Sequence, residues 1–228
     1  MSTQIEPRRP APWSEESSRQ REALISAGKW INDQGWCPAT GGNFSARLSG
    51  TDDLEPHCVV TASGFHKGEL DEGHFLEVDL MGQPLRSGLS IRPSAETLVH
   101  VALYRLDPEI GAVLHAHSIP NTVLSLIHTS EQMVIQGFEM QKALSGQDTH
   151  ESPVVLEVID NTQDMHELAR WVERRWAARD GLRWGLLVRG HGVYVWGRDV
   201  NEARRHLEGV EFLLSCQLEL KKLSAVSQ

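Results

Sequence analysis

Apolar residues recur every three to four positions along five segments of the chain, and this spacing predicts amphipathic helices. The first is expected to begin after Ser14, whose hydroxyl can cap it with Ser17 three residues later, and to end at Gly35. The others cover residues 95–106, 119–128, 165–179 and 200–222, and a further short helix is expected over residues 137–144.

Alternating or β-branched apolar runs predict strands between these helices. The runs that fit cover residues 44–48, 57–62, 75–80, 111–117, 153–159, 186–189 and 193–196. Helices and strands mix along the whole chain, with no internal repeat, low-complexity tract or linker. We therefore expect an α/β fold, layered as α/β/α, in one domain over residues 15–228. Residues 1–14, which are polar and rich in proline, are expected to form a mobile tail.

Composition and charge narrow the classes of partner. The 228 residues carry a formal charge of −9, with 40% hydrophobic residues, enough for a real core. Such a charge argues against general nucleic-acid binding and against anionic membrane surfaces. The three cysteines have no C-x-x-C spacing, so neither a disulfide framework nor a zinc ribbon is expected. Without a signal peptide or a membrane-spanning run, the sequence predicts a soluble cytoplasmic protein.

Three of the eleven histidines stand in a pattern that suggests a metal site. His115 and His117 are two residues apart at the end of a predicted strand, so both imidazoles project from one face. His191 lies between two glycines after another strand and could supply a third nitrogen. Three histidines with one open position are typical of a catalytic zinc. An H-x-H pair alone is more often not a metal site, and His191 could be a turn residue. His100, four residues after Glu96, could line the same pocket or merely pack.

Glycine and serine loops offer backbone amides that could hold an anion in spite of the negative net charge. One loop contains Gly42 and Asn43, a second contains Ser63 and Gly64 with Lys67 nearby, and Ser94 precedes a predicted helix, whose N-terminal amides favour anions. Each loop could equally be an ordinary turn. Neither a P-loop nor a G-x-G-x-x-G fingerprint is present, so a nucleotide cofactor is not supported.

Taken in order, five motifs resemble those of the class II aldolase/adducin family. They are Gly41-Gly42-Asn43-Phe44-Ser45, Ala62-Ser63-Gly64, Pro93-Ser94-Ala95-Glu96, His115-Ala116-His117 and Gly190-His191-Gly192. The resemblance covers roughly residues 17–216 and implies a central, largely antiparallel sheet flanked by helices, forming one catalytic domain. It also implies a cyclic homotetramer with sites near subunit interfaces. One Zn²⁺ per subunit would be held by His115, His117 and His191, and the substrate's phosphate by the glycine and serine loops.

Residues 61–70, 138–144 and 196–211 resemble, more narrowly, dehydratases of this family that act on a small phosphorylated ketose. On that resemblance Glu139 is the proton shuttle and Glu96 a supporting carboxylate that could approach the metal's vacant position; either could also be an ordinary solvated glutamate. Aldolase relatives commonly have Ser where this chain has Ala95, which weakens a plain aldolase assignment. The alternatives are a sugar-phosphate aldolase or epimerase, and an adducin-like interaction module without chemistry.

Overall fold

A computed structural model of the chain describes residues 13–178 and 182–226. Five α-helices are found in these ranges: α1 (Glu15–Asp33), α2 (Thr97–Leu106), α3 (Ile119–Ile127), α4 (Met165–Ala178) and α5 (Val200–Val226). The five predicted helices are thereby confirmed, and α5 continues four residues past the predicted end at residue 222, to Val226. The tail expected over residues 1–14 lies outside the described residues apart from Trp13 and Ser14.

The cap predicted for the first helix is present. The Ser14 hydroxyl accepts a hydrogen bond from the Ser17 amide at 3.1 Å, which satisfies one of the free amides at the helix start. Gly35, just beyond the helix, has a φ of 76°, a conformation that glycine adopts without strain. Three short 3-10 helices are also present: η1 (Lys67–Glu69), η2 (Glu72–His74) and η3 (Glu139–Ala143). The third is the short helix expected over residues 137–144.

All eight strands of the described residues join one sheet, in the order β3-β2-β1-β4-β8-β7-β6-β5. Their bounds are β1 (Asn43–Leu48), β2 (His57–Thr61), β3 (Phe75–Val78), β4 (Ala112–Ala116), β5 (Gln132–Ile135), β6 (Val154–Ile159), β7 (Gly185–Val188) and β8 (Gly192–Gly197). Every neighbouring pair is antiparallel except β6 and β7. The expected, largely antiparallel sheet is confirmed.

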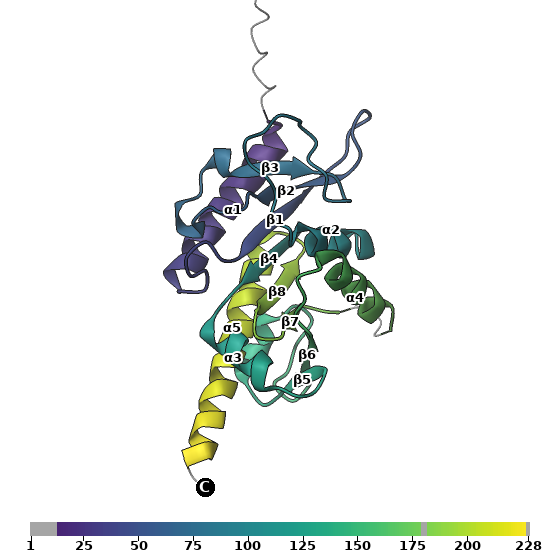
Figure 1. Ribbon diagram of the computed structural model, residues 1–228. Coiled ribbons are helices and arrows are strands. Elements are labelled where there is room, and N and C mark those ends of the chain that lie inside the picture. Colours follow the sequence, from purple (N-terminus) through teal and green to yellow (C-terminus); the bar gives the residue numbers. More distant parts are fainter. Residues whose placement is uncertain (1–12, 179–181, 227–228) are drawn as a thin grey trace, which may run out of the picture.

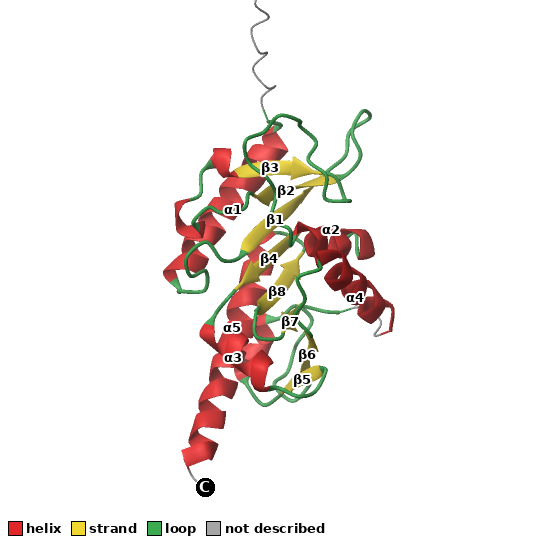
Figure 2. Cartoon of the chain, viewed as in Figure 1, coloured by secondary structure: helices red, strands yellow, loops and turns green. Residues whose placement is uncertain are grey.

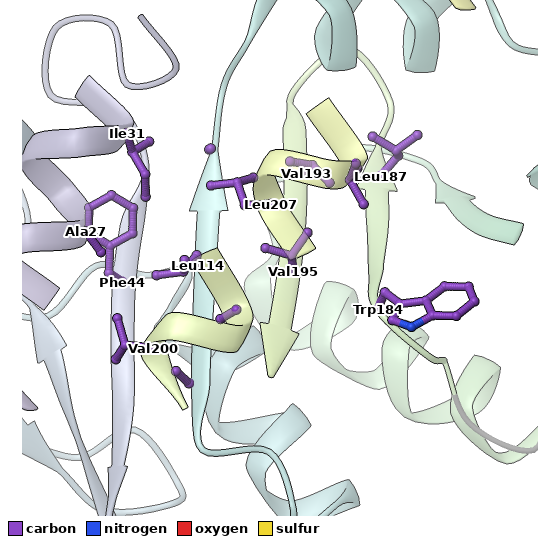
Figure 3. Packing of buried hydrophobic residues seen from close by; sticks show 14 of the residues in the cluster. Ala27, Ile31, Phe44, Leu114, Trp184, Leu187, Val193, Val195, Val200 and Leu207 are labelled. Atoms are coloured by element: carbon purple, nitrogen blue, oxygen red, sulfur yellow. The ribbon is translucent and has the colours of Figure 1, made fainter. Parts of the chain in front are cut away.

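Helices cover both faces of this sheet (Figures 1 and 2). One hydrophobic cluster joins α1, α3 and α5 to one face, and a second joins α2 and α4 to the other. Figure 3 shows Ile31 of α1 and Leu207 of α5 in the first cluster, close to strands of the sheet. Successive side chains of a strand point to opposite faces of the sheet, and most strand residues here are buried. Both faces therefore need a covering layer of helices, which gives the α/β/α arrangement. No helix among the described residues has both the length and the apolar content that a membrane crossing requires.

The register of the central strands brings residues from distant parts of the sequence together. In this register Asn43 of β1 is opposite His115 of β4, and His115 is opposite Tyr194 of β8. The side chains of Asn43 and His115 both approach Glu96, the residue just before α2. Pairing therefore positions the histidine motif beside the first glycine loop.

Candidate metal centre and active site

Four side chains converge at this end of the sheet: Glu96, His115, His117 and His191. Each offers one ligand atom, and these atoms all lie within 4.8 Å of one another. The Nε2 atoms of His115 and His117 are 2.7 Å apart, as their positions two residues apart predict. The Glu96 Oε1 atom is 3.0 Å from His191 Nε2 and 3.5 Å from His115 Nε2. The structure thus brings the three predicted histidines together with Glu96, the carboxylate predicted to approach the metal.

Two glycines leave the space that the histidine motif occupies. His115 is fully buried in β4, while His191 occupies the turn between β7 and β8. Gly192 follows that turn, and a Cβ there would lie 2.8 Å from His117 Cδ2 and 2.9 Å from His115 Cε1. Gly42 has a φ of 77°, and a Cβ there would approach the His115 carbonyl oxygen at 2.6 Å. Both glycines are needed because any side chain would displace a candidate ligand.

Hydrogen bonding orients the central histidine. His115 Nδ1 lies 2.9 Å from the Val193 carbonyl oxygen, to which it can only donate, so its Nε2 carries the lone pair that faces the cluster. The Tyr194 ring stacks on His115, with centroids 3.9 Å apart and planes tilted by 16°. Stacking and hydrogen bond together fix the direction of this imidazole.

The protonation states of the cluster suit a cation. Burial raises the pKa of Glu96, but hydrogen bonds and charges from His115 and His191 outweigh it and hold that pKa well below its usual range. Burial, and then the neighbouring histidines, lower the pKa of His117 to about 3. Asn43 donates a further hydrogen bond to Glu96 Oε2. A carboxylate beside three imidazoles, of which His117 has a lowered pKa, is a ligand set that fits Zn²⁺ or a similar divalent metal.

A cavity of about 220 Å³ opens beside the cluster. Glu96 and His117 of the cluster line this cavity. Its lining also includes all six residues predicted to hold the substrate, namely Gly42, Asn43, Ser63, Gly64, Lys67 and Ser94. Thr40, Gly41 and Ala62 complete the walls; Gly41 and Ala62 belong to the quoted motifs, and Thr40 directly precedes one of them. Loops that are distant in the sequence thus form one polar pocket next to the candidate ligands.

Lys67 is hydrogen-bonded to two of these loops. Its side chain is almost fully buried, and its Nζ donates to the Thr40 carbonyl at 2.9 Å and to the Phe65 carbonyl at 2.7 Å. Burial lowers the pKa of Lys67, while the charges of Cys37 and Glu96 act in the opposite direction. The ammonium group therefore joins the loops that hold Gly42 and Gly64 and contributes positive potential at the cavity wall.

Two further predicted residues have other surroundings. His100 is absent from the cavity lining; it is fully buried behind the cluster, where its Nδ1 lies 2.7 Å from Ser45 Oγ. Glu139 is on η3, outside the cavity, and its side chain is 72% exposed. It pairs with Lys142 at 2.7 Å and approaches His150 at 3.7 Å. Within one chain the structure does not bring Glu139 to the metal cluster.

The fold and this site define a class of protein, and comparison with known families agrees. Residues 22–218 match the family described as the class II aldolase and adducin N-terminal domain. The chain belongs to this family.

Individual relatives show which enzymes of the family the chain is similar to. A methylthioribulose-1-phosphate dehydratase from Serratia proteamaculans is 51% identical over 208 residues, covering 91% of this chain and 98% of the relative. The protein of that name from Pectobacterium atrosepticum is 50% identical with the same coverage. The crystal structure of l-fuculose-1-phosphate aldolase from Thermus thermophilus is 25% identical, with a TM-score of 0.70 over 91% of this chain and 97% of the aldolase.

Proposed function

We propose that the chain catalyses, in the cytoplasm and as a step of methionine salvage, the dehydration of 5-methylthioribulose 1-phosphate to 2,3-diketo-5-methylthiopentyl 1-phosphate. The observation that carries this proposal is the cluster of Glu96, His115, His117 and His191 at the wall of a polar cavity. The two relatives at 51% and 50% identity, which span nearly the whole chain, support the choice of substrate.

Zn²⁺, held by the three histidines, would act as a Lewis acid toward the ketose carbonyl and a neighbouring hydroxyl. The backbone amides around Gly42 and Gly64, with the Ser63 and Ser94 hydroxyls, would bind the phosphate, and Lys67 would keep their loops in place. The lowered pKa of Glu96 keeps it ionised, so it could complete the ligand set until substrate binds. These residues account for binding and orientation of a phosphorylated ketose.

The reaction needs one proton taken from C3 and one water lost from C4. Removal of the C3 proton gives an enediolate; departure of the C4 hydroxyl with a proton then gives an enol, which becomes the 2,3-diketone. A carboxylate that can take and return a proton is required for this sequence. We assign that role to Glu139 because residues 138–144 resemble the dehydratases of the family. Its exposed carboxylate is outside the cavity of its own chain, so a neighbouring subunit would supply it.

A homotetramer is the assembly we propose for this arrangement. On α3, next to the histidine motif, the side chains of Ile119, Val123, Leu126 and Ile127 are 36–75% exposed. An apolar helix face of this kind is costly in water and is typical of a subunit interface. Light scattering coupled to size-exclusion chromatography tests the proposal, since a monomer would leave Glu139 without a metal centre to reach.

A class II sugar-phosphate aldolase is the second candidate. It is favoured by the Glu96 carboxylate 3.0 Å from His191, where it can serve as the acid/base group of carbon–carbon cleavage. Incubating zinc-loaded protein with 5-methylthioribulose 1-phosphate separates the two activities by product. A diketone with loss of water, identified by mass spectrometry, supports dehydration, whereas an aldehyde and a ketone phosphate indicate cleavage. No product of either kind would contradict both activities.

A further inference from the structure

A buried carboxylate lies behind the histidine motif, on the helix layer that carries α3 and α5. Glu211 of α5 is fully buried. Its carboxylate accepts hydrogen bonds from Ser118 Oγ at 2.5 Å and from Asn121 Nδ2 at 2.7 Å. Ser118 directly follows His117 and caps α3, because its Oγ also accepts from the Asn121 amide at 3.1 Å. Glu211 is therefore bonded to both side chains that define the start of α3.

These bonds continue to the backbone of the metal cluster. The second hydrogen of Asn121 Nδ2 is directed at the Ala116 carbonyl oxygen, 3.3 Å away, between the two histidines of the motif. Thr122 Oγ1 lies 3.2 Å from Asn121 Oδ1 and 3.3 Å from the His191 carbonyl oxygen. One connected group of side chains thus spans α5, the end of β4 and the turn that carries the third histidine.

Packing alone does not account for an acid at this position. Burial raises the pKa of Glu211 to about 7, although the hydrogen bonds from Ser118 and Asn121 oppose that shift. Among the residues that the structure describes, no lysine or arginine forms an ion pair with Glu211. Burying a carboxyl without a cation is costly, and an apolar residue of similar size commonly packs as well or better. The acid is explained if its two accepted hydrogen bonds are needed.

We propose that Glu211 is a positioning residue for the metal centre. Through Ser118 and Asn121 it fixes the backbone at the end of β4, and hence the directions of the His115 and His117 imidazoles. It touches neither substrate nor metal. Partners of this kind, behind the ligands, set how well a site is preorganised for its metal. This inference rests on the metal centre of the proposed function.

Zinc affinity of purified variants tests the proposal, measured by competition with a chromophoric chelator. Glu211→Ala removes both acceptors, and Glu211→Gln keeps the volume but only one acceptor oxygen. We expect the alanine variant to bind Zn²⁺ about 10- to 100-fold more weakly and the glutamine variant to fall between it and the wild type. Glu202→Gln is the matched control. Glu202 is also a nearly buried carboxylate of α5, but it bonds Ser145 and Arg198 and none of the residues next to the candidate metal ligands.

The control should bind Zn²⁺ within about twofold of the wild type, because sites without shared partners act independently. Thermal melting of the metal-free forms reports stability separately. If Glu211→Ala does not fold, Glu211→Gln decides the question. Equal affinity in Glu211→Gln and Glu202→Gln would overturn the proposal, as would an undiminished Glu211→Gln effect when Ser118 and Asn121 are both alanine. Failure of the wild type to bind Zn²⁺ would instead contradict the metal centre itself.

Discussion

At the scale of single residues, the candidate metal centre depends on glycine as much as on histidine. A Cβ on Gly192 would lie 2.5 Å from the Ala116 carbonyl oxygen and under 3.0 Å from both His117 and His115. Backbone cannot yield easily at this point, because β4 and β8 pair across it. The positions of the candidate ligands thus depend on the lack of a side chain at Gly192 as well as on the histidines themselves.

Gly192→Ala is therefore expected to weaken the metal centre strongly. The added methyl group must push the imidazoles or the strands apart, at a cost of about 1–3 kcal/mol in unfolding free energy. Zinc content per chain, measured by atomic emission, should fall together with the melting temperature. Gly73→Ala is the control, since a Cβ there meets only Asp71 Oδ1, at 3.1 Å. Full zinc content in Gly192→Ala would contradict this account.

At the scale of elements, loops from separate strands act as one unit because Lys67 joins them. Its two hydrogen bonds end on the carbonyl oxygens of Thr40 and Phe65.

Replacing the ammonium group leaves buried acceptors unpaired, so Lys67→Met should cost about 1–3 kcal/mol in unfolding free energy. It should also raise KM more than it lowers kcat, because the loops proposed to bind the phosphate are loosened. Lys29→Met, at an exposed ion pair on α1, should change neither. An unchanged KM in Lys67→Met would argue against phosphate binding by these loops.

Most elements were predictable from the sequence, whereas one strand and two 3-10 helices were not. All five α-helices and seven of the eight strands of the described residues follow from apolar spacing. Strand β5 (Gln132–Ile135) was missed although β3 and β7 are as short, because it lies at the edge of the sheet and buries only Met133 and Ile135. The 3-10 helices η1 and η2 lie in a stretch with the turn residues of an ordinary loop. For the site, spacing suggests the histidines, but the bonds from Glu211 to Ser118 and Asn121 join residues about 90 positions apart and have no local pattern.

At the scale of the whole molecule, the candidate metal cluster and the proposed proton shuttle, Glu139, do not meet within one chain. The metal cluster and its cavity are at one end of the central strands, while Glu139 extends from η3 with an exposed carboxylate. Two neighbouring copies would bring the cluster and Glu139 together if the assembly is cyclic.

Glu139→Gln should then retain zinc and lose most turnover, and His117→Ala should lose zinc. Near-normal turnover in Glu139→Gln would exclude this carboxylate as the proton shuttle.

Mixing the two inactive variants distinguishes a shared site from a site within one chain. In a mixed ring, a subunit with Glu139→Gln still offers an intact cluster, and a neighbour with His117→Ala still offers an intact Glu139. Random assembly of equal amounts in a cyclic oligomer makes about a quarter of the sites complete, so denatured and co-refolded protein should regain about that fraction of wild-type activity. Each variant refolded alone is the control. If the mixture stays as inactive as its components while forming the same oligomer, Glu139 does not act across the interface.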